Sequence, residues 1–254
     1  MALLEIEKLI VRFGGVIALD EASVSVERGS ICGLIGPNGA GKTTLFNCVS
    51  RLYTPHSGRI EFDGEDLLAR GPHEISSLGI ARSFQNLGLF PSMSVRENVM
   101  LGAYARERPG FLASAASLRA GAARERALRK EADQSLERMR LSEVADHPAT
   151  GLPYGTLKRV ELARAVFQRP RLLMLDEPAS GLNHAEVGEL AELIRALRDD
   201  LDLTVLLVEH NMGMVMGLCG QVVVLDLGQK IAEGEPDAVR ENRRVVEAYL
   251  GAPA

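Results

Sequence analysis

The segment GPNGAGKTT, from Gly36 to Thr44, constrains the fold of this chain more than any other feature. It satisfies the pattern GxxxxGK[ST], directly after the apolar run SICGLIG and before a helical pattern that begins near Lys42. Glycines let such a loop wrap closely, so that successive N–H groups and the positive end of the helix face phosphate groups. The strand-loop-helix order therefore predicts a nucleotide-binding α/β unit.

Residues of this loop are candidates for direct contact with a nucleotide and its metal ion. Lys42 can reach the β and γ phosphates, and the hydroxyl group of Thr43 can bind Mg²⁺. The loop thus predicts a bound nucleoside triphosphate with Mg²⁺. Its candidate nucleotide-binding residues are Gly36, Pro37, Asn38, Gly39, Ala40, Gly41, Lys42, Thr43 and Thr44.

Two adjacent carboxylates follow a second apolar strand, Leu172 to Leu175. Asp176 and Glu177 would lie at the carboxyl edge of the sheet, where open parallel sheets place their ligands. Neighbouring side chains at a strand end point in different directions and can take different roles. Asp176 is the candidate for the Mg²⁺ shell, and Glu177 is the candidate for polarising an attacking water molecule. A solvated turn or a helix cap is the plainer alternative, which the phosphate loop disfavours.

Three further residues are candidates for the same site, and each has a structural alternative. His210 ends the strand LTVLLVEH beside that of Glu177 and could contact the γ phosphate or the water, although such a His can also be a surface or capping residue. Gln85, in ARSFQN, ends a strand, and its amide could ligate Mg²⁺ or the water. Phe13, in VRFGGV, could stack on adenine or pack in the core.

The composition fits one globular α/β domain and disfavours several other classes. The 254 residues include 46% hydrophobic and 25% charged residues, and the net charge of −5 gives no bulk attraction to nucleic acid. Three cysteines without CxxC spacing argue against a disulfide framework or a zinc site and predict buried, reduced thiols. No segment resembles a signal peptide or a bilayer span, so any membrane role would come through a partner.

The pattern along the chain predicts a parallel core sheet with an antiparallel flank and an inserted lobe. Short strand signals dominate the start, namely LLEIEKLIVRF, ASVSVERG, SICGLIG and GRIEFDG. A helical pattern then predicts a lobe over about residues 95–165. Strand signals return at RLLMLD and LTVLLVEH around a helix from Ala185 to Leu201, which implies parallel βαβ crossovers. A single helix is predicted from Pro236 to Leu250.

The order of the motifs resembles that of the ATP-binding-cassette (ABC) ATPases. GPNGAGKTT, Gln85, LPYGTLKRVELARA, LLMLDEP, SGLN and VEHN occur in the family's order, and the resemblance runs from about residue 3 to residue 250. It implies a P-loop NTPase fold in a single domain over residues 1–254, which binds ATP and Mg²⁺ and hydrolyses ATP.

The family's signature segment departs from its usual form here. The signature usually reads LSGGQ and caps the γ phosphate of ATP bound by the other subunit, which makes Leu152, Pro153, Tyr154 and Gly155 candidate ATP contacts. Pro153 and Tyr154 replace Ser and Gly, so the family's serine hydroxyl group is absent. The Gly155 N–H and the N-terminus of the following helix can still face an anion.

A narrower resemblance points to the ATPases of branched-chain amino-acid uptake. It is carried by VRFGGVIALD, SFQNLGLFPSMSVRENV, the Arg-rich insertion from Ala103 to Ala132, the YG form of the signature and the ending EAYLG. Importers of urea, amides and aromatic acids share much of this pattern. The resemblance implies an ATPase coupled to transport, with a second ABC ATPase subunit in a head-to-tail heterodimer, two membrane permease subunits and a periplasmic solute-binding protein. It also implies a cytoplasmic protein held on the inner face of the membrane by the permease.

Other readings remain as alternatives. A soluble ABC ATPase of DNA repair or translation is one, although the coiled-coil inserts, zinc motifs, second cassette or basic tails of such proteins are not evident. A P-loop kinase for a small molecule is another, which the signature segment and the position of His210 disfavour. Within transport, lipopolysaccharide export is the nearest alternative.

Overall fold

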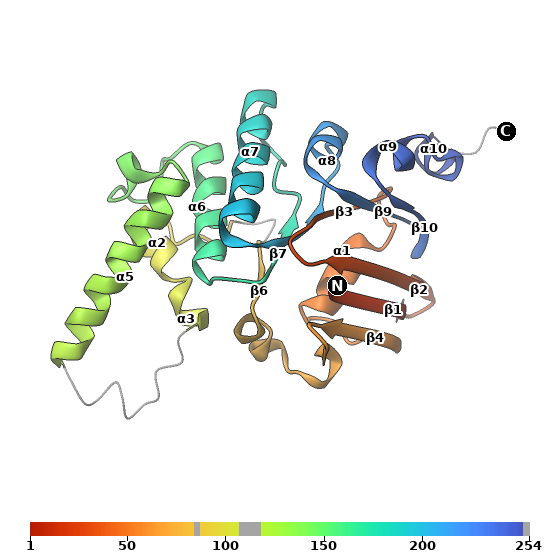
Figure 1. The fold of residues 1–254 in the computed structure, drawn as a ribbon, viewed down its shortest axis with the longest axis horizontal. Helices are drawn as coiled ribbons and strands as arrows, with labels where there is room; N and C mark the ends of the chain where they lie inside the picture. The colour runs from red at the N-terminus through yellow and green to blue at the C-terminus, as the bar shows by residue number, and fades with distance from the viewer. Residues whose placement is uncertain (84–86, 107–117, 251–254) are drawn as a thin grey trace. The chain divides into compact units, whose positions relative to one another are not determined.

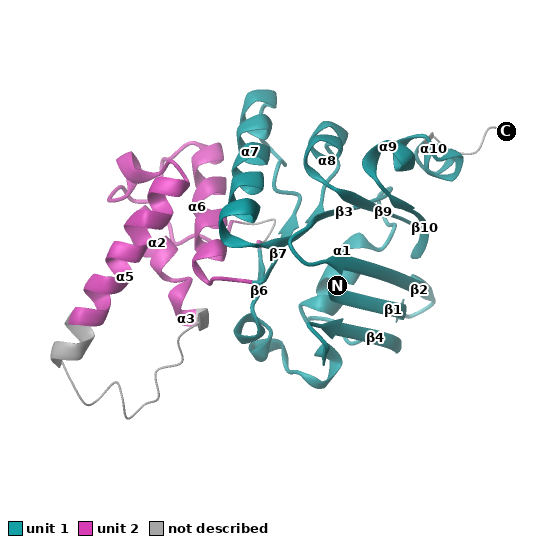
Figure 2. Cartoon of the chain, in the orientation of Figure 1, with its two compact units in different colours: residues 1–82, 171–254 teal, residues 83–170 magenta. Residues whose placement is uncertain are grey.

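A computed structural model describes residues 1–83, 87–106 and 118–250. Two compact units make up the chain, as Figure 2 shows. Unit 1 comprises residues 1–82 and 171–254, and unit 2 comprises residues 83–170. The segment that forms unit 2 thus interrupts the chain of unit 1 between two of its strands.

A six-stranded, mainly parallel sheet forms the centre of unit 1 (Figure 1). Its strand order is β10-β9-β3-β8-β7-β6, and only β10 runs antiparallel to its neighbour. The predicted parallel core sheet is therefore confirmed. The strands are β3 (Ile31–Ile35), β6 (Ile80–Arg82), β7 (Leu172–Asp176), β8 (Thr204–Val208), β9 (Gln221–Asp226) and β10 (Gln229–Gly234).

A four-stranded antiparallel sheet flanks it, as the sequence predicted. Its order is β2-β1-β4-β5, with β1 (Ala2–Phe13), β2 (Val16–Glu27), β4 (Ser57–Phe62) and β5 (Glu65–Asp66). Strand β2 begins six residues before the predicted segment ASVSVERG, because a tight turn at residues 14–15 lets Val16 pair with Phe13. The β1–β2 hairpin is thus longer than the sequence pattern indicated.

One hydrophobic cluster joins the four-stranded sheet, helix α1 (Lys42–Val49) and one face of the six-stranded sheet. Alternate residues of the central strands belong to it, including Cys32, Leu34, Leu172, Met174, Leu206 and Val208. Helix α8 (Met212–Leu218) packs on the other face, where a Cβ atom on Gly33 would lie 3.4 Å from a methyl group of Val215 and 2.9 Å from Sγ of Cys219, the residue after the helix. The site-bearing strands are therefore buried on both faces.

Helix α7 (His184–Leu201) confirms the helix predicted from Ala185 to Leu201. Its N-terminus is a capping box, in which the Asn183 side chain accepts from the N–H groups of Ala185 and Glu186, and Glu186 Oε2 accepts from the Asn183 N–H at 2.9 Å. Its buried residues Val187, Leu190, Ile194 and Leu197 form one apolar stripe. Three short 3₁₀ helices precede β6, namely η1 (Leu67–Ala69), η2 (Pro72–Glu74) and η3 (Ser76–Leu78).

The single helix predicted from Pro236 to Leu250 is wrong, since the chain forms two helices there. They are α9 (Pro236–Arg240) and α10 (Arg243–Leu250). Asn242 lies at the break, and its side-chain oxygen accepts from the Arg244 N–H at 2.9 Å. An Asn that bonds to the backbone two residues on favours the start of a helix over its interior, which accounts for the break.

Unit 2 is helical among its described residues. Its elements are α2 (Val95–Met100), α3 (Ala103–Arg106), α5 (Leu118–Arg138), η4 (Ser142–Val144) and α6 (Tyr154–Phe167). The buried Asn98 side chain ties α2 to the preceding loop through the backbone of Phe90, Met93 and Ser94. Gly102 permits close packing, because a Cβ there would lie 2.4 Å from the Arg164 carbonyl of α6.

The three cysteines are buried and free, as the sequence predicted. Burial raises the pKa of Cys48 to about 11 and that of Cys219 to about 12, so both thiols stay protonated at neutral pH. Among the helices of the described residues, none combines the length and the apolar character that crossing a bilayer requires.

Candidate functional site

The phosphate loop connects β3 to α1 in unit 1 (Figure 1). Gly36 has φ of 150°, and a Cβ atom there would lie 2.0 Å from the Leu225 carbonyl oxygen. Gly41 has φ of 99°, and its Cβ would lie 2.5 Å from the carbonyl oxygen of Ala18. Both the backbone conformation and the close approach of neighbouring strands therefore require glycine at these two positions.

Lys42 lies under this loop with its ammonium group turned toward the loop backbone. Its Nζ donates to the carbonyl oxygens of Gly36 at 2.7 Å and Pro37 at 2.9 Å, and the residue is 6% exposed. Burial lowers the pKa of Lys42, and the negative charges of Glu177 and Asp176 oppose that shift. The lysine is thus held at the loop within the field of both carboxylates.

The C-terminal helix α10 also reaches the phosphate loop. The phenol group of Tyr249 forms a hydrogen bond with the backbone of Gly36. Burial raises the pKa of Tyr249, and this bond opposes the shift. Tyr249 of α10 therefore contacts the loop that begins 213 residues earlier in the sequence.

Asp176 ends β7 and forms a buried ion pair with Arg82, the last residue of β6. Arg82 Nη2 lies 2.8 Å from Asp176 Oδ2, and the Asp176 residue is 3% exposed. Arg82 Nη1 also donates to Asn47 Oδ1 at 2.7 Å and to Ser50 Oγ at 3.3 Å. Its guanidinium group lies 5.5 Å from the centre of the Phe46 ring. Arg82 thereby connects the acidic strand end to α1, a role that its position in ARSFQN did not indicate.

Glu177 and His210 are brought together by neighbouring strands. Strand β8, which precedes His210, pairs with β7, so the predicted adjacency is confirmed. Glu177 Oε1 lies 3.0 Å from His210 Nε2, and both side chains are partly exposed. Glu177 itself has φ of 49°, an uncommon conformation for a residue other than glycine, and its N–H donates to the Val208 carbonyl oxygen at 2.8 Å.

Glu209 is a buried carboxylate that sequence reasoning missed. It is 3% exposed and accepts from three backbone N–H groups. Two of these belong to the next residues, His210 and Asn211, and the third belongs to Ala179, which follows Glu177 by two residues. A carboxylate at the end of the otherwise apolar strand TVLLV was the available signal, but nothing in the sequence indicated its partner.

Phe13 is half-exposed at the end of β1. Of the two alternatives for this residue, stacking on adenine or packing in the core, the structure contradicts packing in the core. Its exposed fraction is 47%, and its ring meets the Tyr53 ring edge-on, with the ring centres 5.2 Å apart. Val16 and Ile17 at the start of β2 are exposed as well. The hairpin end thus presents aromatic and aliphatic surface that could pack against a base.

The signature residues lie at the start of α6 in unit 2. Pro153 occupies the position before the helix, and the helix begins at Tyr154. Both residues are exposed, and the Lys158 ammonium group lies 5.6 Å from the centre of the Tyr154 ring. The remaining predicted ligand, Gln85, lies outside the described residues.

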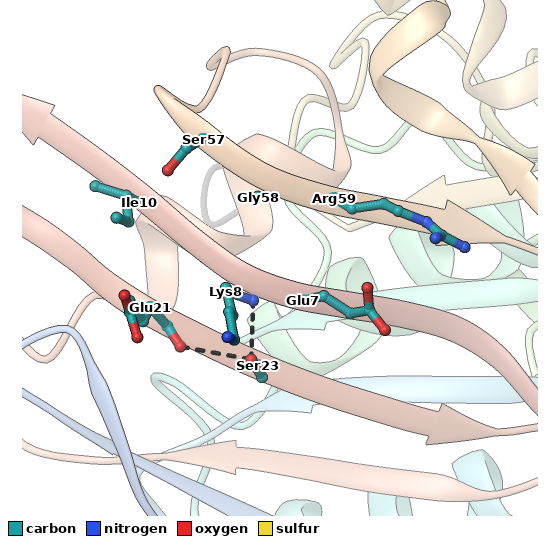
Figure 3. Close-up of a pocket in the computed structure, with 8 residues that line it drawn as sticks. All are labelled: Glu7, Lys8, Ile10, Glu21, Ser23, Ser57, Gly58 and Arg59. Atoms are coloured by element: carbon teal, nitrogen blue, oxygen red, sulfur yellow. Dashed lines mark hydrogen bonds between the residues drawn. The ribbon is translucent and has the colours of Figure 1, made fainter.

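A surface pocket of about 720 Å³ opens on the four-stranded sheet (Figure 3). Side chains of β1, β2 and β4 line it, among them Lys8, Glu21, Ser23 and Arg59. The Lys8 N–H donates to Ser23 Oγ at 2.9 Å across the β1–β2 pair. The residues that line this pocket include none from the phosphate loop and neither Asp176 nor Glu177.

Comparisons with known proteins agree with this arrangement. A family model described as ABC transporter matches residues 19–180, and one described as Branched-chain amino acid ATP-binding cassette transporter matches residues 229–254. The chain is 41% identical over 249 residues to the high-affinity branched-chain amino acid transport ATP-binding protein BraF of Pseudomonas aeruginosa. It is 40% identical over 252 residues to LivG, the protein of the same description from Escherichia coli K12. Each alignment covers 98% of both chains.

A solved structure matches the whole fold as well. The ADP conformation of MJ1267, an ATP-binding cassette of an ABC transporter, superposes with a TM-score of 0.85 at 30% sequence identity and covers 99% of each chain. The chain is thus similar to known ATP-binding cassettes over nearly its full length, in addition to having the phosphate loop and the acidic strand end. This chain belongs to the ABC transporter family, as a nucleotide-binding ATPase with the α/β P-loop fold.

Proposed function

We propose that this chain is the ATP-hydrolysing subunit of an ABC transporter that imports branched-chain amino acids. The observation that carries the proposal is the Glu177–His210 pair, 3.0 Å apart at the sheet edge that also bears the phosphate loop. The functions printed for BraF and LivG support the choice of solute. We assign residues 1–254 to one ABC ATPase domain with a helical lobe over about residues 95–165.

The phosphate loop binds the triphosphate of ATP. Backbone N–H groups between Gly36 and Thr44 face the phosphates, and Lys42 turns from the loop carbonyls to the β and γ phosphates. The exposed face of Phe13 stacks on adenine, which its 47% exposure permits. The chain would thereby hold ATP at both ends.

Hard oxygen donors at the loop and at the acidic strand end suit Mg²⁺. The Thr43 side chain is exposed on the first turn of α1, and Asp176 supplies a carboxylate whose position Arg82 fixes. Gln85 would supply an amide oxygen as a third ligand. When bound, Mg²⁺ would neutralise charge on the phosphate groups.

Glu177 acts as the general base for the attacking water. His210, bonded to the same carboxylate, orients Glu177 and contacts the γ phosphate. The chemistry is an in-line displacement, in which water attacks the γ phosphorus and ADP leaves. Glu177, whose Oε1 lies 3.0 Å from His210 Nε2, accepts the proton of that water.

The complete site requires a second ATPase subunit. In a head-to-tail dimer, the segment Leu152, Pro153, Tyr154 and Gly155 of one subunit caps the ATP on the phosphate loop of the other. The exposed position of Pro153 and Tyr154 suits such a contact. The transporter would further contain two membrane permeases and, outside the membrane, a periplasmic solute-binding protein. The chain would lie in the cytoplasm on the inner face of the membrane, with no nucleic acid as partner.

Reconstitution in lipid vesicles tests this proposal directly. Assembled with the permease, partner ATPase and solute-binding protein of its transporter, the chain is expected to drive accumulation of labelled leucine when ATP and Mg²⁺ are inside the vesicles. Unlabelled isoleucine and valine should compete, whereas ADP should support no uptake. Competition by urea or an aromatic acid, without competition by valine, would reassign the solute. Absence of any ATP-dependent uptake would remove the importer assignment.

The altered signature leads to a second expected result. Loss of one hydrogen bond to a charged phosphate costs about 1.5–3 kcal/mol, or about 10- to 100-fold in rate. If the partner has an intact signature, ATP on Lys42 meets that signature, whereas ATP on the partner meets Pro153 and Tyr154. Glu177→Gln should therefore reduce single-turnover hydrolysis in the transporter more than the equivalent change in the partner. The double change Pro153→Ser and Tyr154→Gly should reduce the difference. Equal losses from the two Gln variants would contradict the asymmetry.

A further inference from the structure

The Glu209 carboxylate joins the two chain segments that carry Glu177 and His210. We propose that Glu209 is a positioning residue that holds Glu177 and His210 at their 3.0 Å separation. This inference rests on the proposed function, because Glu177 matters as the base only if the chain hydrolyses ATP. The link itself can be measured without hydrolysis.

The bonds of Glu209 reach both segments at once. Its Oε1 accepts from the Ala179 N–H at 2.7 Å, in the turn after β7. Its Oε2 accepts from the N–H groups of His210 at 2.8 Å and Asn211 at 2.9 Å, after β8. The same turn is closed by the Ser180 N–H, which donates to the Glu177 carbonyl oxygen at 3.1 Å. One side chain thus fixes the backbone on both sides of the Glu177–His210 pair.

The three bonds require a carboxylate of this length. An ionised carboxyl group only accepts, and its two oxygens can serve three N–H groups. A glutamine at the same place would direct its NH₂ group at one of the backbone N–H groups, so that two donors would meet. An aspartate could still reach the N–H groups that directly follow it but falls short of Ala179. Since the residue is 3% exposed, water does not readily replace a lost partner.

Helix capping does not account for Glu209. Helix α8 already has its own cap, because Asn211 Oδ1 accepts from the Met214 N–H at 3.0 Å. The bond to Ala179 lies outside that helix and spans 30 residues of sequence. It restrains the chain beyond Glu177, whose left-handed conformation persists only when surrounding contacts hold it. The geometry therefore favours a role at the Glu177–His210 pair over a role in α8.

Amide hydrogen exchange on the full chain tests the link. In Glu209→Gln, either the Ala179 amide or those of His210 and Asn211 should exchange faster than in the wild type, because the NH₂ group replaces the acceptor oxygen on one side. In Glu209→Asp, the Ala179 amide should exchange faster while those of His210 and Asn211 stay protected. Asp66→Asn is the matched control, since Asp66 also accepts one backbone N–H, from Leu68 at 2.8 Å, on the other sheet. Unchanged exchange at Ala179 in both Glu209 variants would overturn the proposal.

Single-turnover hydrolysis in the reconstituted transporter tests the consequence. Glu209→Gln should slow hydrolysis by about 10- to 100-fold, the scale of a misplaced catalytic group, while Mg-ATP affinity changes by less than about threefold. In a Glu177→Gln background the same change should cost much less than in the wild type, because the positioned base is already absent and only the placement of His210 remains to be lost. Asp66→Asn should keep the wild-type rate.

Amide exchange and single-turnover hydrolysis together distinguish failure of the Glu209 proposal from failure of the proposed function. A loss that adds fully to that of Glu177→Gln, or a parallel loss of ATP affinity, would indicate a general structural role and overturn the proposal. If the wild-type transporter itself hydrolyses no ATP, the proposed function fails. In that case faster exchange at Ala179 still supports the link made by Glu209, and unchanged exchange still rejects it.

Discussion

Replacing Lys42 with alanine is expected to weaken Mg-ATP binding by at least about 100-fold, or about 2.7 kcal/mol. The ammonium group is held at the loop by two carbonyl oxygens, at 2.7 and 2.9 Å, and lies in the field of Glu177 and Asp176. Without it, the phosphates would approach these two carboxylates with no mobile cation from the loop to offset the repulsion. Calorimetric titration of the purified chain with Mg-ATP measures the effect.

Lys230→Ala is the matched control for this variant. Lys230 is a partly exposed lysine of unit 1 that pairs with Glu233 on β10. Its removal deletes the same side chain and charge and should leave ATP affinity unchanged. An unaltered ATP affinity in Lys42→Ala would show that Lys42 does not bind the nucleotide. Equal losses of affinity in both variants would indicate that the net charge of the chain, and not the position of Lys42, determines ATP binding.

Glu177→Gln is expected to keep ATP binding and to slow hydrolysis by at least about 100-fold, the scale expected for loss of a general base. The amide has nearly the same shape and can still bond to His210 Nε2, so the pair should stay in place. It cannot accept the proton of the attacking water. Titration with Mg-ATP and single-turnover hydrolysis in the assembled transporter separate the two steps.

Glu65→Gln supplies the control for the second variant. Glu65 is an exposed carboxylate that pairs with Arg70 near the four-stranded sheet, and its neutralisation should leave hydrolysis unchanged. Near-normal turnover by Glu177→Gln would show that another group takes the proton. A loss of ATP binding in Glu177→Gln would instead indicate that the carboxylate has a structural role at the loop.

The sequence predicted the parts of the site that depend on residues and elements close to one another along the chain. The phosphate loop followed from glycine spacing between a strand and a helix, and the structure places it between β3 and α1. The adjacency of the strands before Glu177 and His210 followed from parallel βαβ connections, which leave few arrangements. Helix α7 followed from the helical pattern between Ala185 and Leu201, whereas its cap at Asn183 became visible only in the structure.

The parts that were missed depend on contacts between distant residues. Arg82 meets Asp176 across 94 positions, and Glu209 meets Ala179 across 30. Hydrophobic periodicity indicates which face of a strand is buried, but it does not identify the partner of a charged side chain. The break between α9 and α10 was missed for another reason. The side chain of Asn242 starts a new helix at a point where the apolar pattern continues.

The register of the central strands sets the dimensions of the site. Leu34 and Asp176 both pair with Val208, so β3, β8 and β7 end on one line across the sheet. Neighbouring strands lie about 4.8 Å apart, which puts the starts of the phosphate loop and of the acidic turn about 10 Å from each other, with β8 between them. One residue inserted into β8 would advance the imidazole of His210 by about 3.3 Å and turn it to the other face. Strand β8 thus acts as a spacer whose length can vary far less than that of the surface loops.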